Sequence, residues 1–102
     1  MIGDIITYTF KTKEGRDSFI REAKKAHIEE ECLKENGCIR YEYVITTKDD
    51  TSMYLIEFWE NEEVKKPHHN TAHFLYAMEL KKKYCCESTN REKIKFEHIW
   101  IY

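Results

Sequence analysis

Two kinds of apolar spacing take turns along this chain, and their order limits the folds available to it. Apolar side chains recur at every second position, the period of a β-strand, in four stretches: 2–11, 38–46, 53–59 and 91–102. They recur at three- or four-residue intervals, the period of a helix, in two stretches: 16–35 and 68–84. The predicted order of elements is therefore β-α-β-β-α-β.

The segments between these stretches are suited to turns. Asn36-Gly37 should end the first helix, because a glycine just beyond the last turn adopts the left-handed conformation easily. The polar run 47–52 should join two strands into an antiparallel hairpin, and Asn61-Glu62-Glu63 should open a short helical turn before Pro67. This arrangement predicts an α+β, ferredoxin-like fold with both helices on one face of a four-stranded sheet.

Size and charge narrow the class of protein. With 102 residues the chain has room for one core, so we expect a single domain over 1–102. A net charge of −2 argues against nucleic acid as a partner. No apolar stretch approaches the ~20 residues of a membrane helix, and Met1-Ile2-Gly3-Asp4 lacks the basic start of a secretory signal. We therefore expect a cytoplasmic protein without a membrane partner.

The four cysteines do not predict a disulfide framework in a reducing compartment. Cys32 and Cys38 are interpreted as small buried apolar residues. Cys85 and Cys86 are adjacent, so they can form only a strained ring, and two thiolates alone do not complete a zinc site. The pair is assigned no role.

The last stretch predicts a second copy of the chain as a partner. Its apolar side chains fall on both faces of the expected strand. One face carries Ile94, Phe96, Trp100 and Tyr102, and the other carries Ile99 and Ile101. Helices can cover only one face of this sheet. A homodimer that stacks sheet on sheet is the simplest cover for the other face.

Three histidines within 68–73 raise the question of a metal. His69 and His73 are four residues apart and can face one ion on a helix, with Glu57 as a third ligand. No further ligand lies at a suitable spacing, so we expect no metal. The alternative places His68 and His69 in solvent near a helix start and His73 in a partly buried, hydrogen-bonded position.

Three motifs in order resemble the antibiotic biosynthesis monooxygenase family, especially its quinol monooxygenase branch, over nearly the whole chain. They are Glu35-Asn36-Gly37-Cys38-Ile39-Arg40-Tyr41, then Tyr54-Leu55-Ile56-Glu57-Phe58-Trp59-Glu60, then His68-x-x-Thr71-x-His73-Phe74. The resemblance implies a dimeric α/β barrel. It also implies oxidation of a small aromatic or quinol-type substrate with O₂ and without any cofactor.

The implied chemistry assigns roles to particular residues. His73 is the expected base or hydrogen-bond partner of the substrate hydroxyl, since imidazole titrates near neutral pH, and Glu57 is expected to orient it or to act as a second catalytic group. The expected walls of the substrate cavity are the aromatic and imidazole side chains of Tyr41, Phe58, Trp59, His68 and Phe74.

Two departures from the family motifs, Asn36 and Ala72, stand where proline is common and should be harmless. The first strand lacks the asparagine used by haem-degrading relatives, which argues against haem degradation. Because a shared fold does not establish a shared function, a non-catalytic dimeric domain that binds a small ligand remains the alternative.

Overall fold

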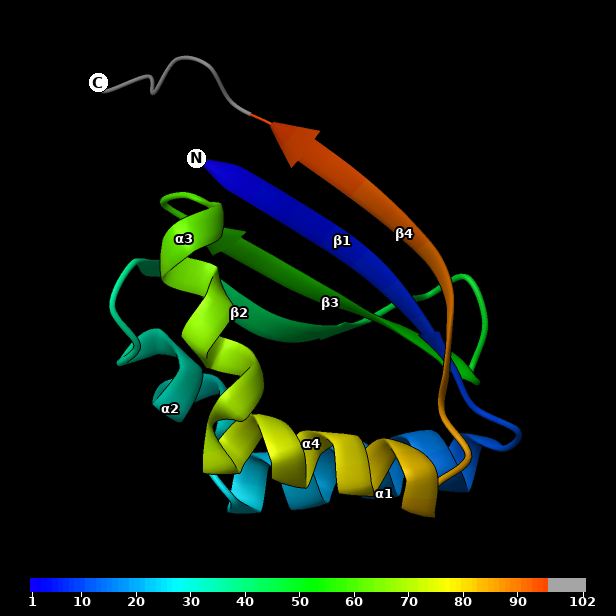
Figure 1. The fold of residues 1–102 in the computed structure, drawn as a ribbon. Helices are drawn as coiled ribbons and strands as arrows, with labels where there is room; N and C mark the ends of the chain where they lie inside the picture. The colour runs from blue at the N-terminus through cyan, green and yellow to red at the C-terminus, as the bar shows by residue number, and fades with distance from the viewer. Residues whose placement is uncertain (96–102) are drawn as a thin grey trace.

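The computed structural model describes residues 1–95, which form one antiparallel sheet with helices on one side (Figure 1). The elements in chain order are β1 (Ile2–Thr9), α1 (Lys13–Lys25), α2 (Ile28–Leu33), β2 (Cys38–Ile45), β3 (Ser52–Trp59), α3 (Glu62–Lys65), the 3₁₀ helix η1 (Lys66–Asn70), α4 (Ala72–Lys83) and β4 (Glu87–Lys95). The strand order is β2-β3-β1-β4. This confirms the predicted α+β, ferredoxin-like fold.

The sheet buries one parity of each central strand against the helices. On β1 the inward side chains include Asp4, Ile6 and Tyr8, and on β3 they include Leu55 and Trp59. Asp4 lies opposite Glu57 and Ile6 opposite Leu55 in the β1–β3 register. The strand alternation seen in the sequence thus places two carboxylates among the apolar side chains that face the helices.

The first helical stretch is two helices rather than the single helix predicted over 16–35. Helix α1 ends at Lys25, and His27 adopts a left-handed conformation with φ of 56° before α2 begins. The break has a packing reason. Phe19 and Ala23 share one helical face, whereas Ile28 and Cys32 are out of phase with it and reach the core only after the chain turns. Leu33, the last apolar residue of the helical stretch predicted over 16–35, is 47% exposed.

The second helical stretch is also interrupted. The short helix predicted at 61–63 is α3, capped by the side chain of Asn61. Residues 66–70 form η1, and α4 begins after Thr71, whose hydroxyl accepts a hydrogen bond from the backbone N–H of Phe74. The helix predicted from residue 68 therefore begins as a 3₁₀ turn.

The last strand starts earlier than predicted, at Glu87. It pairs with β1, and the register shifts between Thr7 and Tyr8. Most of the apolar side chains on which the homodimer prediction was based, from Phe96 to Tyr102, lie outside the described residues.

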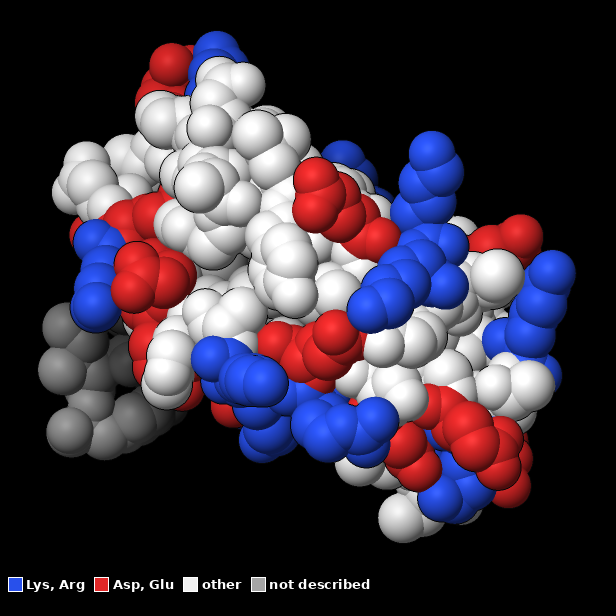
Figure 2. Space-filling view, turned by 90° about the horizontal axis from the view of Figure 1, so that it is seen from below, with Lys and Arg blue, Asp and Glu red and all other residues white. Residues whose placement is uncertain are grey.

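Acidic and basic side chains are interspersed over the helical side of the molecule (Figure 2). Several form exposed pairs one helical turn apart, such as Lys13–Asp17 and Lys34–Glu31, and pairs of this kind contribute little to stability. Within residues 1–95, no helix combines the length and apolar character needed to cross a membrane.

Candidate functional site

A small cavity lies between the inward face of the sheet and the segment η1–α4. Its volume is about 130 Å³. The lining residues come from the four strands of the sheet on one side and from α3, η1 and α4 on the other: Ile6, Tyr8, Tyr41, Leu55, Glu57, Lys65, His68, His69, Phe74, Met78, Lys81 and Arg91. The cavity thus combines aromatic walls with several ionisable groups.

Four of the residues predicted from sequence meet in this cavity. Tyr41, Glu57, His68 and Phe74 all line it. The ring of His68 is 2% exposed, and its centroid lies 5.0 Å from that of Phe74 and 5.6 Å from that of Tyr41. The sheet and the η1–α4 segment, far apart in the sequence, bring these side chains together.

The other three predicted residues lie elsewhere. Trp59 is fully buried and packs on His68, with 5.0 Å between ring centroids, without lining the cavity. Phe58 belongs to the opposite parity of β3 and faces Gly3 on the outer side of the sheet. His73 is outside the cavity lining as well.

Glu57 is held by neighbours on the sheet and on α3. Its Oε1 accepts a hydrogen bond of 2.7 Å from the indole Nε1 of Trp59 and lies 3.6 Å from the Lys65 ammonium. Lys65 also contacts Asp4 at 2.9 Å, and Asp4 in turn contacts Arg91 at 2.8 Å. Two buried carboxylates and two cations therefore form one network at the wall of the cavity, which satisfies the buried charges.

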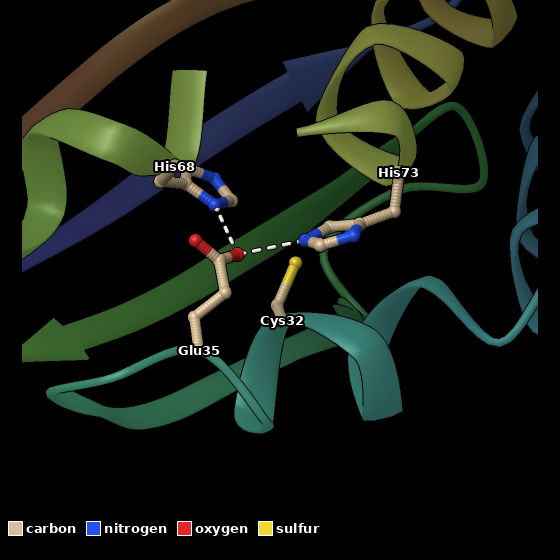
Figure 3. Close-up of side chains that lie close together, drawn as sticks. All are labelled: Cys32, Glu35, His68 and His73. Atoms are coloured by element: carbon tan, nitrogen blue, oxygen red, sulfur yellow. Dashed lines mark hydrogen bonds and ion pairs between the residues drawn. The ribbon is translucent and has the colours of Figure 1, made fainter. Parts of the chain in front are cut away.

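His73 does not meet Glu57, contrary to the arrangement expected from sequence. Its Nε2 lies 2.7 Å from the Oε2 atom of Glu35, and the Nδ1 atom of His68 lies 2.6 Å from that same oxygen (Figure 3). The physical reason is position: Glu35 follows α2, which packs beside α4, whereas Glu57 is occupied on the sheet. Glu35 is the group that orients both imidazoles.

The alternative without a metal placed both His68 and His69 in solvent near a helix start. His69 is exposed, as that alternative predicted, but His68 is buried. The metal set considered from sequence, His69 with His73 and Glu57, is not brought together. Within residues 1–95, the side chains whose ligand atoms cluster within 4.8 Å of one another are Cys32, Glu35, His68 and His73.

Burial changes the acid–base properties of several groups at the site. It raises the pKa of the Tyr8 and Tyr41 hydroxyls well above the usual range. It lowers the pKa of Lys81, whose ammonium lies 4.3 Å from the centre of the Tyr8 ring. The phenols at the cavity therefore stay neutral at ordinary pH.

Sequence reasoning missed Glu35 and the three cations of the lining, Lys65, Lys81 and Arg91. A signal for Glu35 existed, because it opens the Glu-Asn-Gly-Cys motif. The cations carried no local signal: each lies in a charged stretch typical of a solvated surface, and only the tertiary fold directs them to the cavity.

The model of the family described as antibiotic biosynthesis monooxygenase matches residues 4–80. The match runs from β1 into α4 and includes the cavity residues described above, apart from Lys81 and Arg91, whereas β4 lies outside it. The chain belongs to the antibiotic biosynthesis monooxygenase family. The comparison with curated proteins gave no match.

Solved structures agree with this fold. A Bacteroides thetaiotaomicron protein of unknown function, described as a possible oxidoreductase, is 26% identical, with a TM-score of 0.77 over 93% of this chain and 97% of its own. A Nitrosomonas europaea protein, provisionally named an antibiotic biosynthesis monooxygenase, is 21% identical, with a TM-score of 0.75 over 98% and 100% of the two chains. A Deinococcus radiodurans protein with the same provisional name is 17% identical, with a TM-score of 0.77 over 100% and 99%.

Proposed function

We propose that this protein is a cofactor-independent monooxygenase that oxidises a small phenolic or quinol-type ring with O₂. The observation that carries the proposal is the cavity below α4, in which an imidazole, a carboxylate and aromatic walls meet. Membership in the antibiotic biosynthesis monooxygenase family supports oxygenase chemistry.

The size of the cavity limits the substrate. Its volume of about 130 Å³ is below the ~300–1,000 Å³ of sites for drug-sized ligands. We therefore expect a substrate with a single ring that packs against Tyr41 and Phe74.

The charges around the cavity suit an anionic ring. Lys65, Lys81 and Arg91 line it together with one carboxylate, that of Glu57, and Asp4 stands behind Lys65 and Arg91. The three cations therefore outnumber the two carboxylates, those of Glu57 and Asp4. Such an environment stabilises a phenolate, the form of the substrate that donates an electron to O₂ most easily.

His68 is the side chain best placed to take the substrate proton. Its Nδ1 is engaged by Glu35, and its Nε2 makes no hydrogen bond to any other residue in 1–95. A substrate hydroxyl at this nitrogen would transfer its proton to the imidazole. His73, the base expected from sequence, would act through Glu35 as a positioning residue, and Glu57 would hydrogen-bond the ring substituents.

The proposed reaction balances without another reductant. A phenol with hydrogen at the carbon opposite the hydroxyl takes one oxygen atom from O₂ at that carbon. It becomes a quinone, and the second oxygen atom leaves as water with two hydrogens, one from that carbon and one from the hydroxyl group. The substrate supplies all four electrons that O₂ accepts.

Oxygen uptake with a panel of single-ring phenols and quinols tests the proposal. We expect a saturable rate in the wild type and a loss of about 10²-fold or more in His68→Gln, the range typical of a lost general base. Tyr76→Phe, a change on the exposed side of α4, is the matched control and should keep the rate. Ligand-dependent stabilisation without oxygen uptake would contradict the proposal and support the alternative, a non-catalytic ligand-binding domain.

We also propose that the working unit is a homodimer formed through the outer face of the sheet. Within residues 1–95, the helices cover the opposite face (Figure 1). The outer parity carries the half-buried apolar side chains of Ile5, Tyr54, Ile56 and Phe58, a face that a second copy would cover. Light scattering should give the mass of a dimer for the wild type and of a monomer for Ile56→Lys; a monomeric wild type would contradict this proposal.

A further inference from the structure

Four side chains able to bind a metal meet beside the cavity. Cys32 and Glu35 come from α2 and the turn that follows it, His68 comes from η1, and His73 comes from the first turn of α4 (Figure 3). One ligand atom from each, the Cys32 Sγ, a Glu35 oxygen and one nitrogen of each histidine, lies within 4.8 Å of all the others. We propose that these four residues form a binding site for a zinc-type divalent cation.

The donor set fits zinc. Zinc takes four ligands in a tetrahedron, from thiolate, imidazole and carboxylate groups. In zinc sites, paired ligands are typically separated by two to four residues in one segment and by three to five in the other. The pairs Cys32-x₂-Glu35 and His68-x₄-His73 match both separations.

The charges of this set suit a buried cation. Cys32 is fully buried, His68 is 2% exposed, and the side chain of Glu35 is 13% exposed. No lysine or arginine within residues 1–95 pairs with Glu35, whose recorded partners are the two histidines. A divalent cation with one thiolate, one carboxylate and two neutral imidazoles forms a neutral group, which removes the cost of an uncompensated buried carboxylate.

Only small movements are needed to admit the ion. Bonds of about 2.0–2.3 Å in a tetrahedron separate the ligand atoms by roughly 3.3–3.8 Å. The two nitrogen–oxygen distances at Glu35, 2.6 and 2.7 Å, would lengthen by roughly 0.6–0.9 Å as the metal replaces both hydrogen bonds. The Cys32 thiol would give its proton to solvent as it binds the cation.

Cobalt titration tests the site, since Co²⁺ replaces zinc and absorbs in the near ultraviolet only when a thiolate is a ligand. The full chain, without a histidine tag and stripped with chelator, is titrated with Co²⁺ and then with Zn²⁺. We expect one Co²⁺ per chain with thiolate-to-metal absorption that Zn²⁺ removes. The absence of saturable binding, or binding without thiolate absorption, would overturn the proposal.

Matched variants locate the ion. Cys32→Ser should abolish the thiolate absorption, whereas Cys38→Ser should keep it, because the Cys38 Sγ instead contacts the backbone carbonyl of Arg40. His73→Gln should weaken binding by more than the roughly 10–100-fold typical of losing an outer-shell partner of a metal. His27→Asn removes an exposed histidine outside the cluster, in a conformation that asparagine tolerates, and should bind as the wild type does.

A second measurement covers the case in which Cys32→Ser does not fold. Glu35→Gln keeps the size of the side chain but removes its charge. Zinc should raise the melting temperatures of the wild type and of His27→Asn, and it should leave that of Glu35→Gln unchanged. Equal stabilisation of all three proteins would contradict the site. None of these measurements involves a substrate, so they separate this proposal from the proposed oxidation.

Discussion

The indole Nε1 of Trp59 donates a hydrogen bond to the Oε1 atom of Glu57, two residues earlier on the same face of β3, at 2.7 Å. Both side chains are buried, at 0% and 5% exposure. The bond fixes the orientation of a carboxylate that lines the cavity, and it joins the apolar core to the network of Asp4, Lys65 and Arg91. A buried hydrogen bond to a charged group is among the stronger polar interactions in a protein.

Trp59→Phe should destabilise the fold by about 2–5 kcal/mol, since it removes a hydrogen bond to a charged group and leaves a cavity beside His68. Urea unfolding measures the free energy. Glu57→Gln is the comparison, because the amide oxygen of glutamine can still accept the hydrogen bond from Trp59 and the side-chain volume is unchanged. Glu57→Gln should lose less unfolding free energy than Trp59→Phe. Equal losses in the two variants would contradict this expected order.

Gly37→Ala should destabilise the protein by about 2–4 kcal/mol, since Gly37 has a positive φ of 83° and lies against Val64. An added Cβ would overlap a methyl carbon of Val64. The double variant Gly37→Ala/Val64→Ala should recover the steric part of the loss and keep the conformational part. Thermal unfolding of both variants checks this. Additive effects of the two substitutions would contradict the contact.

Tyr43→Phe should stabilise the protein by about 1–3 kcal/mol, because the hydroxyl oxygen of Tyr43 is the one fully buried side-chain nitrogen or oxygen atom in residues 1–95 without a hydrogen-bond partner. The ring contacts with Phe19 and Tyr41 remain. Tyr76→Phe, at a more exposed position, should change stability little. A destabilised Tyr43→Phe would contradict the assignment.

The same substitution should also change the response to alkali. Burial raises the pKa of Tyr43 in the folded state. The part of the unfolding free energy that is linked to this pKa shift is fully present below the unfolded pKa of about 10 and is lost as pH rises toward the folded pKa. Unfolding free energies measured from pH 8 to 11 should fall less steeply for Tyr43→Phe than for Tyr76→Phe. Parallel curves would refute this.

Alkylation of the thiols should follow their exposure. Burial raises the pKa of Cys38 to about 11 and that of Cys86 to about 12, so few of these thiols are ionised near pH 8. Cys85 is exposed and should react first with iodoacetamide. Peptide mass spectrometry at several times gives the four rates, and the rates of Cys38 and Cys86 should rise about tenfold per pH unit up to their pKa. Faster labelling of Cys86 than of Cys85 would contradict the burial described.

Zinc should inhibit the proposed oxidation. A cation bound to Nδ1 of His68 would leave Nε2 as a donor that cannot accept the substrate proton. Oxygen uptake should therefore fall at least tenfold when one equivalent of zinc is bound, and chelator should restore it. Bound zinc with an unchanged rate would contradict His68 as the base and leave the metal site intact.

The fold was accessible from sequence because strand alternation and helical spacing are local signals. The break at His27 was not, because the charged residues around it suit one long helix as well as two, and only the packing of Ile28 and Cys32 decides between them. In the candidate site, Glu57, Tyr41, His68 and Phe74 were accessible through their motifs. The partner of His73 was not, since Glu35 lies 38 residues away along the chain and the tertiary fold alone selects it over Glu57.

The four-residue cluster joins the two halves of the chain. Cys32 and Glu35 belong to the first β-α-β half, and His68 and His73 belong to the second, so neither half contains more than two of the four groups. The cluster can therefore exist only after the halves have docked. Any spectroscopic probe placed on it would report the completion of folding, rather than the earlier formation of single helices or hairpins.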